Sequence, residues 1–290
     1  MNIQEERRDF LENKNIAESV LLSFHGVEGY DVYNCSVPFI WKGKRYIFGR
    51  VERRTEWMRS WVRLFYETGT DDWTLVPDSM IYQLEDPYIS VIKDQLVLGG
   101  THVRVRENKL DTYYGYFYRG SEVDDLYYFT TGPDYMKDIR LVELADGQIG
   151  VFSRPRNEEI LKKHGSESMI GFSVIRSLDD LTAEVIENAP LIDSLFEDGE
   201  WGGCNQAYLL DSGKIGVIGH RSYLYKDSDG EDQSSKGPAK KPNLSDCAFT
   251  SGIVMRDDGK ADLYSGLGDC MEGRIVIQYP FEGYGQIAGC

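Results

Sequence analysis

The sequence predicts an all-β fold, specifically a β-propeller, and three observations favour it. Its 19 tyrosines, 12 phenylalanines and 30 glycines lie in short alternating runs broken by turns, which is typical of strands. No long stretch carries the 3.6-residue apolar stripe of a helix. A four-strand pattern recurs with a period of roughly 50 residues, the signature of propeller blades. We therefore expect five four-stranded antiparallel blades around a central funnel.

Each predicted unit begins with two apolar runs joined by a polar turn. The five examples are VPFIWKGKRYIFGRVE, DPYISVIKDQLVLGGTH, IRLVELADGQIGVFSRP, NQAYLLDSGKIGVIGHRS and FTSGIVMRDDGKADLYSGLGD. Outer hairpins with an Asp-Asp turn follow in three units, namely VRLFYETGTDDWTLV, GYFYRGSEVDDLYYF and FSVIRSLDDLTAEV. A pair of β-sandwiches would also give many short strands, but it does not account for one hairpin recurring at a near-constant period.

We expect residues 1–290 to form one propeller domain. Residues 1–15 are a charged N-terminal extension, expected to be a short helix on the outside or an ordered edge. Residues 226–246 form a long polar loop, rich in Gly, Ser and Pro, that replaces or extends the outer hairpin of the fourth unit.

Composition excludes several classes of partner. A formal charge of -16 and a pI near 4.7 repel nucleic acid and anionic membrane surfaces. No segment reaches the ~20 apolar residues of a membrane span, and the N-terminus has no signal-peptide pattern, so we expect a cytoplasmic protein. Five cysteines without CxxC spacing indicate reduced thiols rather than disulfides or zinc.

Polar residues at equivalent strand ends should converge on the propeller axis. The heads of the inner strands supply Asn34, Glu85-Asp86, Lys137-Asp138 and Asn205, and the ends of the following strands supply Arg50, His102, Arg154, His220 and Asp269. Such a mixture of carboxylates, amides and cations suits a carbohydrate, whose hydroxyls need donors and acceptors and whose glycosidic oxygen needs a proton. It suits a metal less well, so we predict no metal site. Taken singly, Arg50, Arg154 and His220 are equally well explained as strand-end partners of turn carboxylates.

Several of these segments resemble motifs of glycoside hydrolase family 130, the β-mannoside phosphorylases and mannosidases of the five-bladed β-propeller glycosidase clan. LEDPYIS resembles the family's Glu-Asp-Pro-Arg motif, and NCSVP with the later GRV resembles its first-blade Asn and Arg. KDIRL with SRP, GVIGHRS and YSGLGD resemble segments of the third, fourth and fifth blades. The chain looks closest to a divergent branch, formerly of unknown function, that is related to mannoside phosphorylase/mannosyltransferase proteins.

The resemblance implies an enzyme that cleaves or phosphorolyses β-mannoside-like oligosaccharides with inversion. Asp86 would donate the proton, and partial burial should raise its pKa towards an acid's role. Glu85 would instead pair with a neighbouring arginine. The sugar would be held by Asn34, Arg50, Arg63 and Asp269, joined in the funnel by Asp138 and Asn205. Lys137, Arg154 and His220 would lie where family phosphorylases hold phosphate.

Two differences from the family's motifs leave the type of reaction undecided. Tyr88 stands where the family has arginine, which leaves phosphate as an open co-substrate, with no other cofactor expected. Asn34 stands where related glycosidases have a catalytic aspartate, so a hydrolase would need another base, for which Glu200 in EDGEWGGCNQ is the best candidate. A mannosyltransferase, a non-catalytic oligosaccharide-binding propeller and a scaffold propeller remain alternatives, and homo-oligomerisation stays open.

Overall fold

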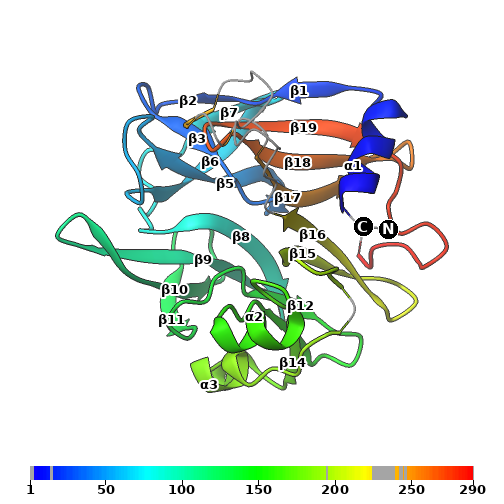
Figure 1. Cartoon of the computed structure of the whole chain (residues 1–290). Coiled ribbons are helices and arrows are strands. Elements are labelled where there is room, and N and C mark those ends of the chain that lie inside the picture. The colour runs from blue at the N-terminus through cyan, green and yellow to red at the C-terminus, as the bar shows by residue number, and fades with distance from the viewer. Residues whose placement is uncertain are drawn as a thin grey trace, which may run out of the picture.

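The structure is a computed structural model that describes residues 3–13, 16–193, 195–223, 239–241, 244 and 247–289. Most of the predicted polar loop, residues 226–246, lies outside the described residues. Strands dominate the rest and are arranged as a propeller (Figure 1), which confirms the predicted all-β propeller class. No helix in the described ranges is long and apolar enough to cross a membrane.

The described strands form five sheets, which we number in chain order. Sheet I contains β2 (Ser23–His25), β7 (Asp72–Leu75), β6 (Trp61–Gly69), β5 (Lys44–Glu52), β3 (Asp31–Tyr33) and β4 (Phe39–Trp41). Sheet II contains β8 (Glu85–Ile92), β9 (Gln95–Arg106), β10 (Lys109–Gly120) and β11 (Tyr127–Thr131). Sheet III contains β12 (Arg140–Glu143), β13 (Ile149–Ser153) and β14 (Gly171–Ile175), and sheet IV contains β15 (Glu200–Leu209) and β16 (Ile215–Tyr223). Sheet V contains β17 (Ala248–Met255), β18 (Ala261–Leu267), β19 (Met271–Ile277) and β1 (Ser19–Leu21).

The prediction of five regular four-stranded blades is not confirmed. Only sheets II and V have four strands among the described residues, whereas sheet III has three and sheet IV has two. In sheet III the predicted second strand of FSVIRSLDDLTAEV is wrong, because the 3₁₀-helix η1 (Leu178–Asp180) and helix α3 (Ala183–Glu187) form there instead. Ser177 and Asp180 form a capping box, and the Thr182 hydroxyl accepts from Val185 N at 3.3 Å. Local capping therefore overrides the strand pattern.

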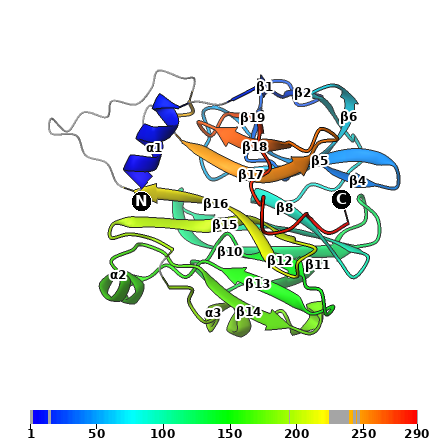
Figure 2. The same cartoon turned by 90° about the vertical axis from the view of Figure 1, so that its right-hand side faces the viewer.

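The N-terminal segment joins the first and last sheets. Strand β1 pairs antiparallel with β19 at the edge of sheet V, and β2, two residues later, pairs parallel with β7 at the edge of sheet I. Arg274 of β19 strengthens this junction, because it binds Glu18 at 2.7 Å and Asp71 at 2.5 Å. The ring of sheets is thus closed through strands far apart in sequence (Figures 1 and 2).

Helix α1 (Ile3–Glu12) confirms the expected N-terminal helix and has no buried residue. It lies beside β16 on the outside of the sheets (Figures 1 and 2). Among the described cysteines, Cys35 and Cys204 are buried free thiols. Cys290 lies outside the described residues.

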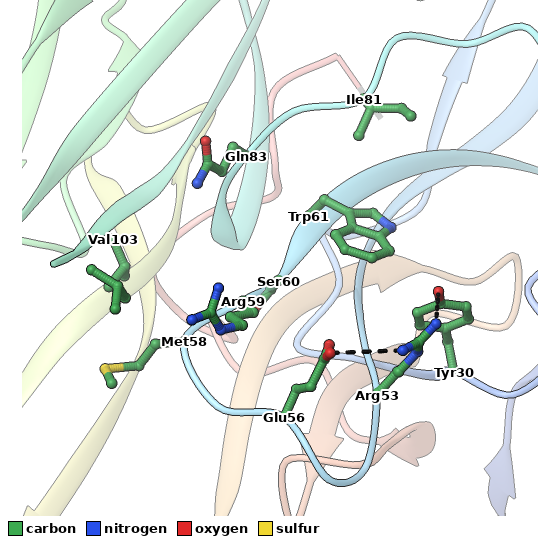
Figure 3. A pocket seen from close by; sticks show the side chains of 11 residues that line it. Tyr30, Arg53, Glu56, Met58, Arg59, Ser60, Trp61, Ile81, Gln83 and Val103 are labelled. Carbon is green, nitrogen blue, oxygen red and sulfur yellow. Dashed lines mark hydrogen bonds and ion pairs between the residues drawn. The ribbon is translucent and has the colours of Figure 1, made fainter. Parts of the chain in front are cut away.

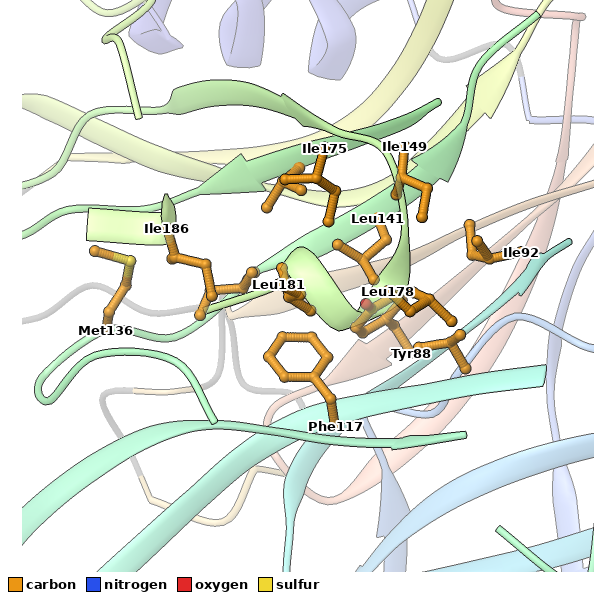
Figure 4. Close-up of a cluster of buried hydrophobic side chains, with 13 residues drawn as sticks. Tyr88, Ile92, Phe117, Met136, Leu141, Ile149, Ile175, Leu178, Leu181 and Ile186 are labelled. Carbon is orange, nitrogen blue, oxygen red and sulfur yellow. The ribbon is translucent and has the colours of Figure 1, made fainter. Parts of the chain in front are cut away.

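Four of the apolar clusters lie between successive sheets, and a fifth, which includes Ile47, Phe65 and Trp73, lies within sheet I. Figure 4 shows the cluster between sheets II and III, where Tyr88 and Phe117 meet Leu141, Ile149 and their neighbours. Further clusters join sheets I and II, III and IV, and IV and V. Burial between the sheets fixes their mutual orientation, and therefore also fixes where their inner edges meet.

The strand pairing is interrupted in sheets I, II, IV and V. The pairing shifts register at Asp86-Pro87 in β8, at Asn205 in β15 and at Ser251 in β17, while sheet I breaks between β3 and β4 after Asn34. Such bulges re-aim a side chain out of the ladder. Pro87, which has no N–H to donate, suits such a break.

The left-handed backbone conformation is shared by two of these positions, Asn34 and Asp86, and by Asp138, which precedes β12. Asn34, Asp86 and Asp138 have φ of 46°, 48° and 57°, in the left-handed region that Asn and Asp tolerate better than most residues. Asn34 and Asp86 are 52 residues apart, and Asp138 follows at the same interval. The repeat therefore places one polar side chain from each of three sheets at an equivalent point.

Candidate active site

A buried arginine organises the first half of the site. The Arg50 guanidinium, on β5, binds Asp86 Oδ1 at 2.9 Å and Glu85 Oε1 at 3.0 Å. Its Nε donates to Ser60 Oγ at 2.8 Å, and the Tyr33 ring lies 4.7 Å below it. The prediction that Glu85 pairs with an arginine is confirmed. Because every face of Arg50 is engaged, Asp86 is held in one position.

Asn34 links two carboxylates from sheets II and V. Its Nδ2 donates to Asp86 Oδ1 at 2.9 Å and lies 3.4 Å from Asp269 Oδ1. Gly266 permits this approach, since a Cβ there would lie 1.9 Å from Asn34 Oδ1. Asn34 Oδ1 itself is buried without a hydrogen-bond partner among the described residues. An acceptor is thus left available beside the two carboxylates.

The second half of the site comes from sheets III and IV. Asp138 is buried and is paired with Arg154 of the segment after β13, with Arg140 3.8 Å away. His220 Nδ1 lies 2.6 Å from Asn205 Oδ1, and the Asn205 amide donates to Thr250 O at 2.5 Å. The predicted residues of these sheets are therefore brought together.

Lys137 lies between the two halves. Its charge acts on Glu85 and Asp86 on one side and on Asp138 and His220 on the other. It is half-buried, and no hydrogen bond or ion pair to it is found within the described part of the chain. Lys137 is the cation of the cluster that is least committed to a protein partner.

The carboxyl groups divide into two kinds. Burial would raise the pKa of Asp86, but Arg50 and Lys137 outweigh it and hold that pKa below its ordinary value. The prediction of a raised pKa for Asp86 is therefore wrong for the unliganded site, because the sequence could not show these cations. Burial raises the pKa of Glu85, and burial together with the charge of Asp86 raises the pKa of Asp269. Neighbouring carboxyl groups whose pKa values are shifted in opposite directions are typical of sites that transfer protons.

The second half is also electrostatically polarised. Burial opposes ionisation of Asp138, but Arg154 and Lys137 prevail and hold its pKa well below the ordinary value. Burial lowers the pKa of His220 to about 4, so its imidazole is neutral at physiological pH. A neutral His220 offers one donor and one acceptor beside fixed cations.

Three groups of this site have no recognisable signal in the sequence. Lys240 comes from the polar loop, and its Nζ is paired with Glu52 and lies 3.3 Å from the Tyr33 hydroxyl. Tyr33 in turn donates to Glu52 Oε2 at 2.7 Å. Glu52 follows Arg50 by two positions, so strand alternation places both on one face, but nothing in GPAKKP predicts that Lys240 is buried.

Tyr88 has a defined place although it departs from the family motif. Its ring is buried beneath the Arg140 guanidinium, with 4.6 Å from the guanidinium carbon to the ring centre. Gly99 on β9 makes room for this ring, because a Cβ there would lie 2.0 Å from it. Arg140 of the adjacent sheet thus places a cation over the Tyr88 ring.

Two predicted residues are not part of this cluster. Arg63 reaches the Pro77 carbonyl at 3.4 Å and contacts none of the other candidates. Glu200 is buried at the start of β15, about 16 Å along an extended strand from Asn205. Its two oxygens accept from Ile3 N at 2.7 Å and Glu197 N at 3.1 Å, and Arg221 lies 3.6 Å away. These contacts anchor helix α1 and give no support to a role as base.

His102 also lies outside the cluster, because it stacks on Tyr116 and its Nδ1 lies 3.0 Å from the Gln83 carbonyl. Within the described ranges, no three His, Cys, Asp or Glu side chains form a group that could hold a metal ion.

The chain is similar to several solved structures. A mannose phosphorylase from Leishmania mexicana, determined in complex with phosphate ion, is 50% identical over 99% of this chain and 96% of its own, with a TM-score of 0.91. A GDP-Man-dependent mannosyltransferase from the same organism is 47% identical over 99% and 97%, with a TM-score of 0.89. A β-1,2-mannobiose phosphorylase from Listeria innocua, 12% identical over 92% and 93%, shares the fold with a TM-score of 0.55.

A search of curated protein sequences finds no match. Residues 8–234 and 231–283 match the family described as a protein of unknown function, DUF1861. The chain therefore belongs to the DUF1861 family.

Proposed function

We propose that this protein is an inverting mannoside phosphorylase, a carbohydrate-active enzyme that uses inorganic phosphate to cleave β-mannosides. One observation carries the proposal: the charge of Lys137 acts both on Asp86, in the cluster of sugar-type groups, and on Asp138, which is paired with Arg154 in the cationic cluster. The close similarity to a mannose phosphorylase supports the same substrate class. We also propose that the five sheets correspond to five blades, of which sheet IV is a reduced one.

The first cluster has the chemistry needed to hold the sugar. Asn34 and Asp269 offer an amide and a carboxyl beside Asp86, so adjacent hydroxyls can both donate and accept. Arg50 is buried and therefore acts by fixing Asp86 rather than by contacting solvent. We assign Asp86 as the proton donor, acting directly or through a sugar hydroxyl.

The second cluster supplies the phosphate site. Lys137 and Arg154 provide donors, and Arg140 adds positive charge beside them. Neutral His220 gives its single N–H to Asn205 Oδ1, so its Nε2 accepts from a protonated phosphate oxygen. Because Lys137 lowers the pKa of Asp86, a phosphate bound against Lys137 cancels part of that effect. Phosphate binding would therefore raise the pKa of Asp86 and favour its protonated form.

The reaction balances with these groups alone. A phosphate oxygen forms a bond to the anomeric carbon as the glycosidic bond breaks, and the proton carried by Asp86 goes to the leaving sugar oxygen. Attack from the side opposite the leaving group inverts the anomeric carbon, so a β-mannoside yields α-mannose 1-phosphate. The phosphate ester then returns a proton to the site.

A mannosyltransferase is the second candidate, because a GDP-Man-dependent enzyme is nearly as similar as the phosphorylase. A hydrolase is less well supported, since Glu200, its predicted base, is engaged by backbone N–H groups. The cytoplasmic location and the single domain of residues 1–290 stay predictions, and homo-oligomerisation stays open.

The decisive experiment is incubation with β-mannobiose with and without inorganic phosphate, followed by phosphorus NMR. We expect α-mannose 1-phosphate only when phosphate is present. Free mannose formed equally without phosphate would instead identify a hydrolase, and turnover only with GDP-mannose would identify a transferase.

The phosphate site has a matched control two residues along the chain. Arg154→Gln should raise the KM for phosphate at least tenfold. Arg156→Gln should not, because Arg156 is exposed and is paired with Glu167 at the surface. Equal effects of both substitutions would contradict the assignment.

A further inference from the structure

A cavity lies beside the proposed active site. Its volume of about 530 Å³ is within the range of small-molecule sites. One wall is the loop of residues 53–60 between β5 and β6, and the opposite wall is the far end of the β9–β10 hairpin. Figure 3 shows Trp61 near Tyr30 on one side and Met58 near Val103 on the other. None of the side chains predicted for the active site lines this cavity.

The cavity shares structure with the active site. Ser60, which lines it, accepts the hydrogen bond from Arg50 Nε, and Arg50 holds Asp86. Gln83, also a lining residue, lies two positions before Glu85 on the segment that enters β8. Ser60 and Gln83 therefore link the cavity wall to the residues that hold Asp86.

The far wall belongs to the part of the β9–β10 hairpin that extends beyond β8, where β10 also contacts residues 134–136. Strand β8 pairs with β9 only as far as Thr101, so the hairpin beyond it projects as two strands (Figure 1). Two-stranded extensions are marginal by themselves. This extension is tied back by Arg59, whose guanidinium donates to Asn108 Oδ1 at 2.9 Å. Its half-buried Val103 and Val105 face the cavity rather than another sheet.

The near wall is held in a restricted conformation. Met58 has a φ of 61°, which is uncommon for a long side chain, and the adjacent Arg59 N donates to Glu52 Oε1 at 2.8 Å. Backbone kept in this region is found preferentially at functional sites. The loop is thus fixed to Glu52 of the active site on one side and to the hairpin on the other.

The lining identifies the class of ligand. Trp61 and Tyr30 provide aromatic surface, with ring centres 5.5 Å apart, and the Gln83 amide provides donors and an acceptor. The charges are already partnered, because Arg53 donates to the Tyr30 hydroxyl at 3.1 Å and lies 3.8 Å from Glu56. A diphosphate would need uncommitted cations, whereas a neutral sugar needs aromatic faces and amides.

We propose that this cavity binds the outer sugar units of an oligosaccharide whose reacting mannose lies at Asp86. The inference rests on the proposed function, since it adds further sugar units to the mannoside that this function cleaves. The enzyme then prefers longer chains because the cavity adds binding contacts remote from the reacting bond.

Two measurements on purified protein test the inference. Calorimetric titration with mannotetraose is expected to show binding that weakens at least tenfold in Trp61→Ala and in Val103→Arg, the second of which fills the cavity without removing packing. Turnover should show a kcat/KM that rises with chain length from mannobiose to mannotetraose, and this rise should disappear in both variants. Tyr284→Ala, which removes an exposed aromatic ring outside the cavity, should change neither measurement.

Failure of the inference and failure of the proposed function are distinguishable. If no mannoside is turned over, the proposed function fails, and the titration alone shows whether the cavity binds mannotetraose. Mannotetraose binding that is absent in the natural protein, or is unchanged in both cavity variants, overturns the inference even when mannobiose is phosphorolysed. Weakened binding of GDP-mannose but not of mannotetraose in these variants overturns it as well, because the ligand class would then be wrong.

Discussion

Arg50 and Asp86 form an ion pair of 2.9 Å in which both side chains are almost fully buried. Removing one partner of such a pair leaves an uncompensated charge in a low-dielectric environment, which costs far more than the pair contributes. Arg50 therefore holds both the position and the ionisation of the proposed proton donor.

Arg50→Gln should lower the free energy of unfolding by about 3–5 kcal/mol, measured by urea denaturation at pH 7. Because the folded pKa of Asp86 is depressed, its stabilisation is present above the unfolded pKa and is lost as pH falls through the folded value. The difference between natural protein and variant should thus shrink in acid. Adding Asp86→Asn to the variant should recover part of the loss, and no recovery would contradict the pairing.

Asp86→Asn by itself should abolish most turnover while the protein still folds. Arg50 keeps its contact with Glu85, and an asparagine retains an acceptor for Arg50 and Asn34. We expect kcat to fall by about 10²–10⁴-fold, the usual contribution of a general acid. Circular dichroism and the urea midpoint serve as controls for folding, and an unchanged kcat would exclude Asp86 as the proton donor.

Lys240 and Lys241 provide a matched pair of substitutions in one segment. Lys240 is paired with the fully buried Glu52, whereas the ammonium of exposed Lys241 lies 3.7 Å from the Trp57 ring centre. Lys240→Ala should cost about 3 kcal/mol of stability, and Lys241→Ala less than about 1 kcal/mol. Thermal unfolding of both variants tests this, and equal losses would show that the Glu52 pair is not the anchor.

Glu272 should make stability depend on pH near neutrality. It is buried, accepts from Cys35 N at 3.0 Å and Ser251 Oγ at 3.2 Å, and burial raises its pKa to about 8. Between the ordinary glutamate pKa of 4.5 and about 8 the folded state holds a proton that the unfolded state has lost, so stability falls as pH rises. Glu272→Gln should flatten this part of the profile of urea midpoints from pH 5 to 8. An unchanged slope would mean that Glu272 ionises normally.

His220 should make stability depend on pH in the opposite direction. Burial lowers its pKa from 6.5 to about 4. Below pH 6.5 the unfolded state therefore binds a proton that the folded state does not bind. Its contribution is therefore lost as pH falls from 6.5 to 4, and His220→Gln should reduce that loss. Urea midpoints of the natural protein and the variant from pH 4 to 7 test this, and an unchanged acid slope would contradict it.

Local sequence determined the strands and the polar residues at their heads. Alternation and turn residues predict the β5, β8–β9, β12–β13 and β15–β16 segments, because both signals depend on neighbours in the chain. The same logic failed at residues 177–187, where capping by Ser177 and Thr182 produced helices in place of a strand. Motif spacing also predicted that Asn34, Asp86 and Asp138 share an equivalent position.

Tertiary structure decided what those residues do to one another. The pKa of Asp86 is lowered rather than raised because cations from sheets I and III, Arg50 and Lys137, reach it only after the ring has closed. Lys240 enters from a loop without any periodic signal, and Glu200 turned out to hold helix α1. Charge interactions and burial depend on distances between residues remote in sequence, so a one-dimensional pattern identifies the participants but not their ionisation, their partners or the cavity beside them.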